Sequence, residues 1–259
     1  MLRKLHDPSA GRMRVAAFMS GSGTNLEKII GHQKRLEAAR GSAPFAVAVI
    51  FTDNYKSRAC EIGAANDLPV VVRDMAAFYR RRGLPRRDLS IRAEYDAMTV
   101  EALRPYGAPF AAYAGYMSVA SPVLVNAFLG VNVHPADLSV EVGGKRRFVG
   151  GHAVRDAIRA GETAVASSTH VVEDAVDGGR LVLISEPMNV EIPRGLDLST
   201  GEGLGAAERH NQDLLKVRGD WEIFPLTLEL IADGRIATDE NGMLHLDGAP
   251  IPKGKRLPL

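Results

Sequence analysis

Residues 15–30 have the sequence VAAFMSGSGTNLEKII, and this stretch decides the fold. The uninterrupted apolar run from Val15 to Met19 predicts a buried strand, whereas Leu26, Ile29 and Ile30 recur at the spacing of one helix face. The glycines and serines between the two patterns predict a tight loop. A strand, a glycine loop and a helix in this order begin a β-α-β unit, so we expect a sheet of parallel strands.

The same alternation continues along the chain and extends the sheet. Helical patterns occupy residues 58–66 and 91–106, between further short apolar runs at residues 45–51, 69–72, 110–114 and 130–133. Residues 164–172 and 181–190 then read as two strands joined through a turn, which predicts an antiparallel pair. We therefore expect an α/β fold of the Rossmann-like type, with a mostly parallel central sheet, helices on both faces and an antiparallel extension.

Three segments follow from this reading. Residues 1–12 form an N-terminal extension that we expect to be frayed, residues 13–235 form the main domain, and residues 236–259 form a C-terminal hairpin and tail whose turn is Asn241-Gly242. Within the main domain, the glycine-rich residues 201–205 are expected to be a connector. The helical pattern over residues 206–232 is expected to break near Arg218-Gly219 and at Pro225.

Composition and charge exclude several classes of protein. Lys and Arg number 32 against 31 Asp and Glu, so no overall field attracts nucleic acid or a membrane surface. Cys60 is the single cysteine, which rules out an internal disulfide and a cysteine-based metal site and is typical of a reducing compartment. Residues 1–11 lack the apolar core of a secretory signal, and no apolar run is long enough to span a bilayer. We expect a cytoplasmic protein with small-molecule substrates, as a monomer or homodimer.

The glycine loop has the composition of an anion site. Its residues lie where a strand ends and a helix begins, so backbone N–H groups and the helix dipole favour a negative charge there. The loop lacks the Gly-Lys-Ser/Thr of a nucleotide-binding P-loop, and Leu26 replaces the third glycine of the dinucleotide pattern, so we expect a single phosphate. Ordinary turn and capping chemistry would explain the same residues equally well. The candidate phosphate ligands are Gly21, Ser22, Gly23, Thr24 and Asn25.

A second polar motif follows a later strand, at Asn132-Val133-His134-Pro135. Strand alternation directs Asn132 and His134 to the same face, at the carboxyl edge where open α/β sheets bind ligands. Histidine can donate to a developing oxyanion or accept a proton, and a nearby carboxylate such as Asp177 would raise its pKa. Spacing alone leaves a structural role for these polar groups equally open, and for Asp177, in an Asp-Gly-Gly turn, it favours one.

With these motifs in place, the chain resembles the folate-dependent glycinamide ribonucleotide formyltransferases of purine synthesis. The resemblance runs from Arg14 to Ile236 and makes residues 13–235 a formyltransferase domain. Asn-x-His-Pro together with Asp-Gly-Gly seven residues after His170 is its most specific part. The other matching segments are Ser20-Gly21-Ser22-Gly23-Thr24-Asn25, Ala114-Gly115-Tyr116-Met117, Ser168-Thr169-His170-Val171-Val172, Phe224-Pro225-Leu226 and Ala232-Asp233-Gly234-Arg235.

The resemblance implies a mechanism and a set of site residues. It implies direct transfer from 10-formyltetrahydrofolate to an amine, without a metal and without a covalent enzyme intermediate. Asn132 and protonated His134 would stabilise the tetrahedral oxyanion, while Asp177 would favour that protonation and relay protons. The glycine loop would hold the phosphate of the acceptor, and Asp220 would contact its amine-bearing part. The folate-binding residues would be Tyr116, Met117, Ser118, Val119, Ala120 and Val172.

Several positions depart from the family pattern, mainly where the acceptor is recognised. Ser118 replaces an arginine, Val217 replaces a glutamine, and a basic loop at residues 143–147 is inserted after the catalytic histidine. The loop could supply a missing positive charge or be a solvated surface. The exact acceptor therefore stays open, and another phosphorylated or sugar amine, hydrolysis of the formyl group, and folate binding without turnover remain alternatives.

Overall fold

Strand β2 (Met13–Met19) lies at the centre of a parallel sheet and is buried except at Arg14. It pairs with β3 (Phe45–Thr52) on one side and β5 (Phe110–Tyr113) on the other, both parallel. The next strands outward are β4 (Val70–Val72) beside β3 and β6 (Leu129–His134) beside β5, again parallel. Strands buried on both faces are apolar without alternation, which is the pattern of residues 15–19.

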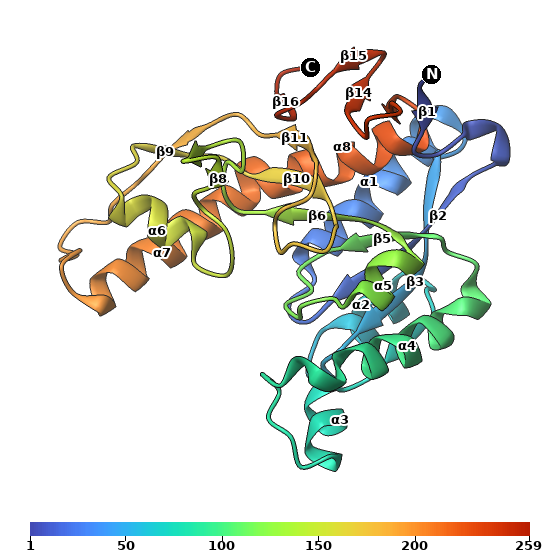
Figure 1. The fold of residues 1–259 in the computed structure, drawn as a ribbon, viewed down its shortest axis with the longest axis horizontal. Coiled ribbons are helices and arrows are strands. Elements are labelled where there is room, and N and C mark those ends of the chain that lie inside the picture. Colours follow the sequence, from blue (N-terminus) through green and yellow to red (C-terminus); the bar gives the residue numbers. More distant parts are fainter. The chain divides into compact units, whose positions relative to one another are not determined.

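The structure is a computed structural model that describes all 259 residues. The chain divides into two compact units (Figure 1). The first, which we call the N-terminal unit, comprises His6–Asn132 and Val172–Asp174. The second, the C-terminal unit, comprises Met1–Leu5, Val133–Val171 and Ala175–Leu259. The chain passes from one unit to the other inside β6, between Asn132 and Val133.

Helices cover both faces of the parallel sheet in the N-terminal unit. Helices α3 (Met75–Arg81) and α4 (Arg92–Leu103) pack on one face through an aromatic cluster that includes Phe18, Phe51 and Tyr95. On the opposite face, Gly63 of α2 (Ala59–Ala65) lies near Ile50 and so close to Val70 that a Cβ would be 2.3 Å from the Val70 side chain. The remaining elements of this unit are η1 (Pro8–Ala10), α1 (Thr24–Arg40), η2 (Leu89–Ile91), η3 (Arg104–Tyr106) and α5 (Pro122–Ala127).

Small antiparallel pairings characterise the C-terminal unit. The expected antiparallel pair is confirmed as β10 (Ser168–Val171) with β11 (Leu181–Ile184), and β11 also pairs in parallel with β16 (Lys255–Arg256). A separate sheet has the order β1-β13-β14-β15. Its strands are β1 (Arg3–Lys4), β13 (Ile236–Thr238), β14 (Leu244–Leu246) and β15 (Ala249–Pro250). Two further two-stranded pairs are β9 (Ala164–Val165) with β12 (Met188–Asn189), and β7 (Glu141–Val142) with β8 (Lys145–Arg146).

The first residues of the chain and the C-terminal hairpin pair within the sheet of order β1-β13-β14-β15, whereas the last strand, β16, pairs with β11. The expected hairpin at Asn241-Gly242 is present, because β13 and β14 pair antiparallel around it and Gly242 has a φ of 81°. The first residues are more ordered than expected, since Arg3 and Lys4 pair with Thr238 and Ala237. The expectation of a frayed start is therefore wrong for these residues.

The last long helical run differs from the expectation in two respects. Helix α7 (Gly201–Leu215), the π-helical turn η4 (Lys216–Asp220) and helix α8 (Trp221–Ala232) follow one another without a break, as the continuous orange ribbon of Figure 1 shows. Residues 201–205 are helical rather than a connector, because Thr200 caps the helix and Gly203 packs too close to Asp197 for a side chain. Pro225 lies within α8 without ending it.

The remaining helix, α6 (Ala153–Arg159), packs against α7 through buried alanine, valine and isoleucine side chains. No helix of the chain combines the length and the apolar character needed to cross a membrane.

Candidate active site

His134 ends β6, and its imidazole is 5% exposed. Its Nδ1 lies 3.4 Å from Oδ2 of Asp177, and its Nε2 lies 2.9 Å from the carbonyl oxygen of Phe148. The shorter contact is a hydrogen bond, and a carbonyl oxygen only accepts, so the proton of the neutral ring belongs on Nε2. A second proton, on Nδ1, would then face the Asp177 carboxylate.

Asp177 lies in a turn whose geometry explains the Asp-Gly-Gly motif. Its φ of 51° is left-handed, a conformation that aspartate tolerates better than most residues. Gly178 donates to the carbonyl of Ala175 at 2.9 Å and closes the turn. Gly179 passes so near strand β10 that a Cβ on it would lie 1.8 Å from the carbonyl oxygen of Val171. The second glycine is therefore a steric requirement that brings Asp177 to its partners.

Three groups besides His134 hold the Asp177 carboxylate and its turn. The backbone N–H of Gly150 donates to Oδ2 at 2.8 Å, and Nε2 of His170 lies 3.5 Å from Oδ1. Arg146 donates to the carbonyl oxygens of Asp177 and Gly179. Both Gly150 and Arg146 lie in the segment between His134 and α6, and Arg146 belongs to the basic loop at residues 143–147.

The electrostatics of the pair differ in part from the expectation. Burial alone would raise the pKa of Asp177, but hydrogen bonding by His170, the charge of His134 and the Gly150 N–H outweigh it and lower the pKa to about 2. For His134, burial lowers the pKa below its ordinary value, although Asp177 and the Phe148 carbonyl act in the opposite direction. The expectation that a carboxylate raises the pKa of His134 is correct for that one contribution and wrong for the net direction, because desolvation dominates.

His170 is a site residue that sequence reasoning did not single out. It lies on β10, is 3% exposed, and its Nδ1 lies 2.9 Å from the carbonyl oxygen of Val171. Because the carbonyl can only accept, Nδ1 donates to it, and a hydrogen bond from Nε2 to the Asp177 carboxylate requires a second proton, on Nε2. Its fixed spacing before the Asp-Gly-Gly turn was the available signal.

The glycine loop lies in the N-terminal unit, at the start of the 17-residue helix α1. Gly23 has a φ of 71°, and a Cβ on it would lie 2.4 Å from Ile62, so no other residue fits there. Gly21, by contrast, has open space around it. Arg58 ties the loop to α2 by donating to the carbonyls of Gly21 and Ser22.

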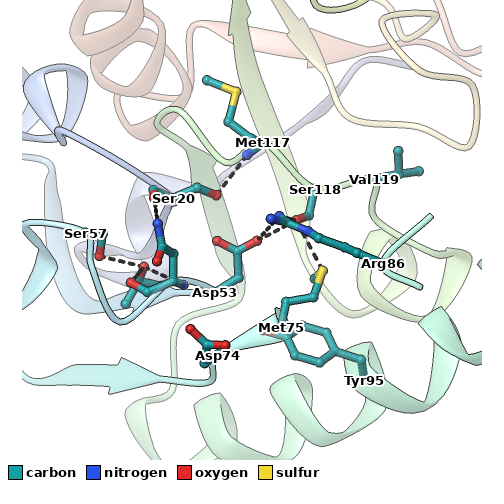
Figure 2. A network of polar contacts seen from close by, with 12 residues as sticks. Ser20, Asp53, Ser57, Asp74, Met75, Arg86, Tyr95, Met117, Ser118 and Val119 are labelled. Carbon is teal, nitrogen blue, oxygen red and sulfur yellow. Dashed lines mark hydrogen bonds and ion pairs between the residues drawn. The ribbon is translucent and has the colours of Figure 1, made fainter. Parts of the chain in front are cut away.

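Ser20 connects the glycine loop to the segment expected to bind folate, residues 116–120. Its backbone N–H donates to the Gly115 carbonyl at 3.0 Å, and its Oγ accepts the Met117 N–H at 3.0 Å (Figure 2). Its carbonyl accepts from the side chain of Asn54 at 2.9 Å. The structure thus brings the two predicted ligand loops together at a single serine.

The segment 116–120 combines apolar and polar side chains. Met117 is 79% exposed and Val119 is 46% exposed, and Figure 2 shows both side chains pointing away from the polar contacts. Ser118 instead donates to the buried carboxylate of Asp53 and accepts from Arg86 at 2.8 Å. The guanidinium of Arg86 is half exposed and pairs with Asp53 at 3.3 Å. An arginine from the loop before α4 therefore lies beside the serine that replaces the family arginine.

Three other predicted site residues, Asp220, Val172 and Asn132, lie outside the contacts described so far. Asp220 is 6% exposed at the end of η4, and its Oδ1 accepts from Ser167 at 2.5 Å. Val172 is half-buried and packs against the aromatic cluster of the N-terminal unit. Asn132 lies on β6 two positions before His134, so its side chain leaves the same face of the strand.

Fold and site together define a class of protein. The chain has an α/β fold with a mixed, mostly parallel sheet, a glycine loop after its central strand β2 and a buried His–Asp pair at the end of β6. Residues 13–194 match the family model described as formyl transferase. The chain belongs to the formyl transferase family.

Relatives and solved structures agree on the branch of the family. The chain is 25% identical to phosphoribosylglycinamide formyltransferase of Haemophilus influenzae, over 93% of this chain and 96% of that protein. The structure of phosphoribosylglycinamide formyltransferase from Bacillus halodurans is 28% identical, with a TM-score of 0.59 over 83% of this chain and 93% of that one. The structure of the phosphoribosylglycinamide formyltransferase from Coxiella burnetii is 21% identical and has a TM-score of 0.70, over 95% of this chain and 100% of that one. It supports the fold.

Proposed function

We propose that this protein transfers the formyl group of 10-formyltetrahydrofolate to the amine of glycinamide ribonucleotide in purine synthesis. The observation that carries the proposal is the buried pair of His134 and Asp177, two positions after Asn132, in a chain of the formyl transferase family. The names of the relatives support the choice of acceptor.

His134 is built to stabilise developing negative charge. Its Nε2–H, which donates to the Phe148 carbonyl, can be redirected to an oxygen that gains charge as the amine adds to the formyl carbon. The Asn132 amide offers a second, neutral donor from the same strand face. As the oxygen becomes negative, a proton on Nδ1 is favoured by Asp177, which stays ionised because its pKa is held near 2. Collapse of the tetrahedral intermediate would break the bond between the formyl carbon and the folate nitrogen, and the proton lost by the amine would pass through water to that leaving nitrogen.

The folate segment has the chemistry that the co-substrate requires. The exposed side chains of Met117 and Val119 offer apolar contact to a ring system, and backbone groups within residues 116–120 are proposed to hydrogen-bond its polar edge. Val172 would add to the same apolar wall. Arg86, beside Ser118, supplies a cation where the family pattern has one. When bound, the folate supplies the formyl group.

The glycine loop is the proposed site for the acceptor's phosphate. Gly21, Ser22, Gly23, Thr24 and Asn25 precede or begin α1, where the N–H groups of the first turn and the helix dipole favour an anion. Asp220 is proposed to contact the amine-bearing part of the acceptor, with Ser167 fixing its carboxylate. We place the reaction in the cytoplasm, which the single exposed cysteine, Cys60, supports.

The decisive experiment measures formyl transfer to glycinamide ribonucleotide by the wild type, by His134→Ala and by His210→Ala. The control histidine is on α7, away from Asp177, and pairs with Glu191. Transfer should fall by about a hundredfold or more in His134→Ala and stay unchanged in the control. Normal transfer by His134→Ala would refute the mechanism.

The same assay separates the other functions. If the wild type transfers to another phosphorylated or sugar amine in a panel, the acceptor assignment is wrong and the chemistry stands. Formate release without any amine would indicate hydrolysis. Folate binding without product from any acceptor would indicate a protein that has lost turnover.

A further inference from the structure

The basic loop after His134 contains a hairpin that is exposed except at Arg146, which is half-buried. Strands β7 (Glu141–Val142) and β8 (Lys145–Arg146) pair antiparallel around Gly143-Gly144. The two glycines have φ values of 59° and 75°, the combination that a two-residue turn with the twist of the strands requires. The hairpin therefore has a defined conformation, which fixes the direction in which the side chain of its last residue, Arg146, projects.

Arg146 holds the turn that carries Asp177. Its Nη1 donates to the carbonyl oxygen of Asp177, and its Nη2 donates to the carbonyl oxygen of Gly179 at 2.7 Å. The planar guanidinium thus bridges two carbonyls of one turn with two nitrogens held at a fixed spacing, a geometry that the single nitrogen of a lysine does not reproduce. Its neighbour Lys145 is exposed and makes no such contact.

The turn needs an external support. Asp177 has a left-handed φ, and Val176 before it is 60% exposed, so local packing on that side of the turn is sparse. The carboxylate must nevertheless reach Oδ2 contacts with Gly150 and His134 at 2.8 and 3.4 Å. Two of the groups that hold the turn and its carboxylate, Arg146 and the Gly150 N–H, come from the segment between His134 and α6.

We propose that Arg146 is a positioning residue that fixes the Asp177 turn, and with it the carboxylate beside His134, through its two carbonyl hydrogen bonds. The effect on catalysis rests on the proposed function, whereas the effect on the turn does not. The charged or titratable groups that face Asp177 are His134 from β6, His170 from β10 and Arg146 itself from β8.

The first test follows the turn without any substrate. Because the Gly150 N–H donates to the Asp177 carboxylate, its amide exchange rate, measured by NMR, reports whether the carboxylate is in place. We expect Arg146→Met to speed this exchange by about tenfold or more, and Lys145→Met, which removes the same charge from the same hairpin, to leave it unchanged. Unchanged exchange in Arg146→Met, or equal acceleration in both variants, would overturn the proposal.

The second test is a double-mutant cycle in the transfer assay. Arg146→Met should lower kcat by about ten- to hundredfold with little change in KM, as loss of an outer hydrogen-bonding partner commonly does. In an Asp177→Asn background the same substitution should add less than about threefold, because its effect passes through Asp177. Arg146→Lys should recover little. Additive losses would mean that Arg146 acts independently and would overturn the proposal. Failure of the proposed function, with no transfer even by the wild type, would leave the exchange test decisive.

Discussion

Replacing Asp177 by Asn should reveal how much stability the buried carboxylate contributes. Asparagine has the same shape, tolerates a left-handed φ and can still accept the Gly150 N–H, so the substitution removes the charge and little else. The native pKa of about 2 lies below the ordinary value of 3.8. At about 1.4 kcal/mol per pKa unit, the ionised carboxylate stabilises the native state by about 2 kcal/mol at pH 7.

The sign of the pH dependence follows from the lowered pKa. A carboxyl group that ionises more readily in the native state stabilises it above the unfolded-state pKa, and this contribution is lost as the pH falls through the native pKa. Urea unfolding of wild type and Asp177→Asn should therefore differ by about 2 kcal/mol at pH 7 and by about 1 kcal/mol at pH 3. A difference that does not change with pH, or one that grows on acidification, would refute the reasoning.

Three further predictions concern the same site and the loop beside it. The His134 ring should titrate below its ordinary pKa, and Asp177→Asn should lower that pKa further because the carboxylate favours the imidazolium; NMR titration that shows an increase would contradict this. Gly179→Ala should destabilise the fold by more than about 3 kcal/mol in urea unfolding, since its Cβ meets a backbone oxygen, whereas Gly151→Ala, with open space around it, should cost under about 1 kcal/mol; equal costs would disprove the clash. Asp53→Ala should lower the free energy of unfolding by about 1–3 kcal/mol, because it removes the carboxylate to which Ser118 donates. An unchanged midpoint of urea unfolding would show that this hydrogen bond does not contribute to stability.

Local patterns predicted the parallel sheet well. The apolar runs that became β2, β3 and β5 are buried on both faces, so their residues report burial directly, without any partner being known. The position of the glycine loop followed from the same runs. The antiparallel pair β10–β11 was likewise readable from two apolar segments and a turn.

Contacts between distant segments could not be predicted from the sequence. Spacing placed Asn132 and His134 on one strand face, but only the folded turn places Asp177 at His134. The net pKa of His134 was mispredicted because burial, which a sequence does not display, outweighs the neighbouring charge. Residues 201–205 were misjudged because glycine composition indicates a linker, whereas Gly203 serves close packing in a helix.

The π-helical turn η4 has a consequence for the phase of the last long helix. Its five residues, Lys216–Asp220, occupy a turn that an α-helix would fill with about 3.6. Because π-helical hydrogen bonds run from residue i to i+5, such a turn holds about one residue more than an α-helical turn. Removing one residue from η4 would therefore restore an α-helical turn and leave the phase of everything beyond it nearly unchanged. The apolar side of α8, with Ile223, Phe224 and Leu228 buried, would keep facing its core. A single deletion within α7 or α8 would instead rotate the residues beyond it by about 100° relative to those before it.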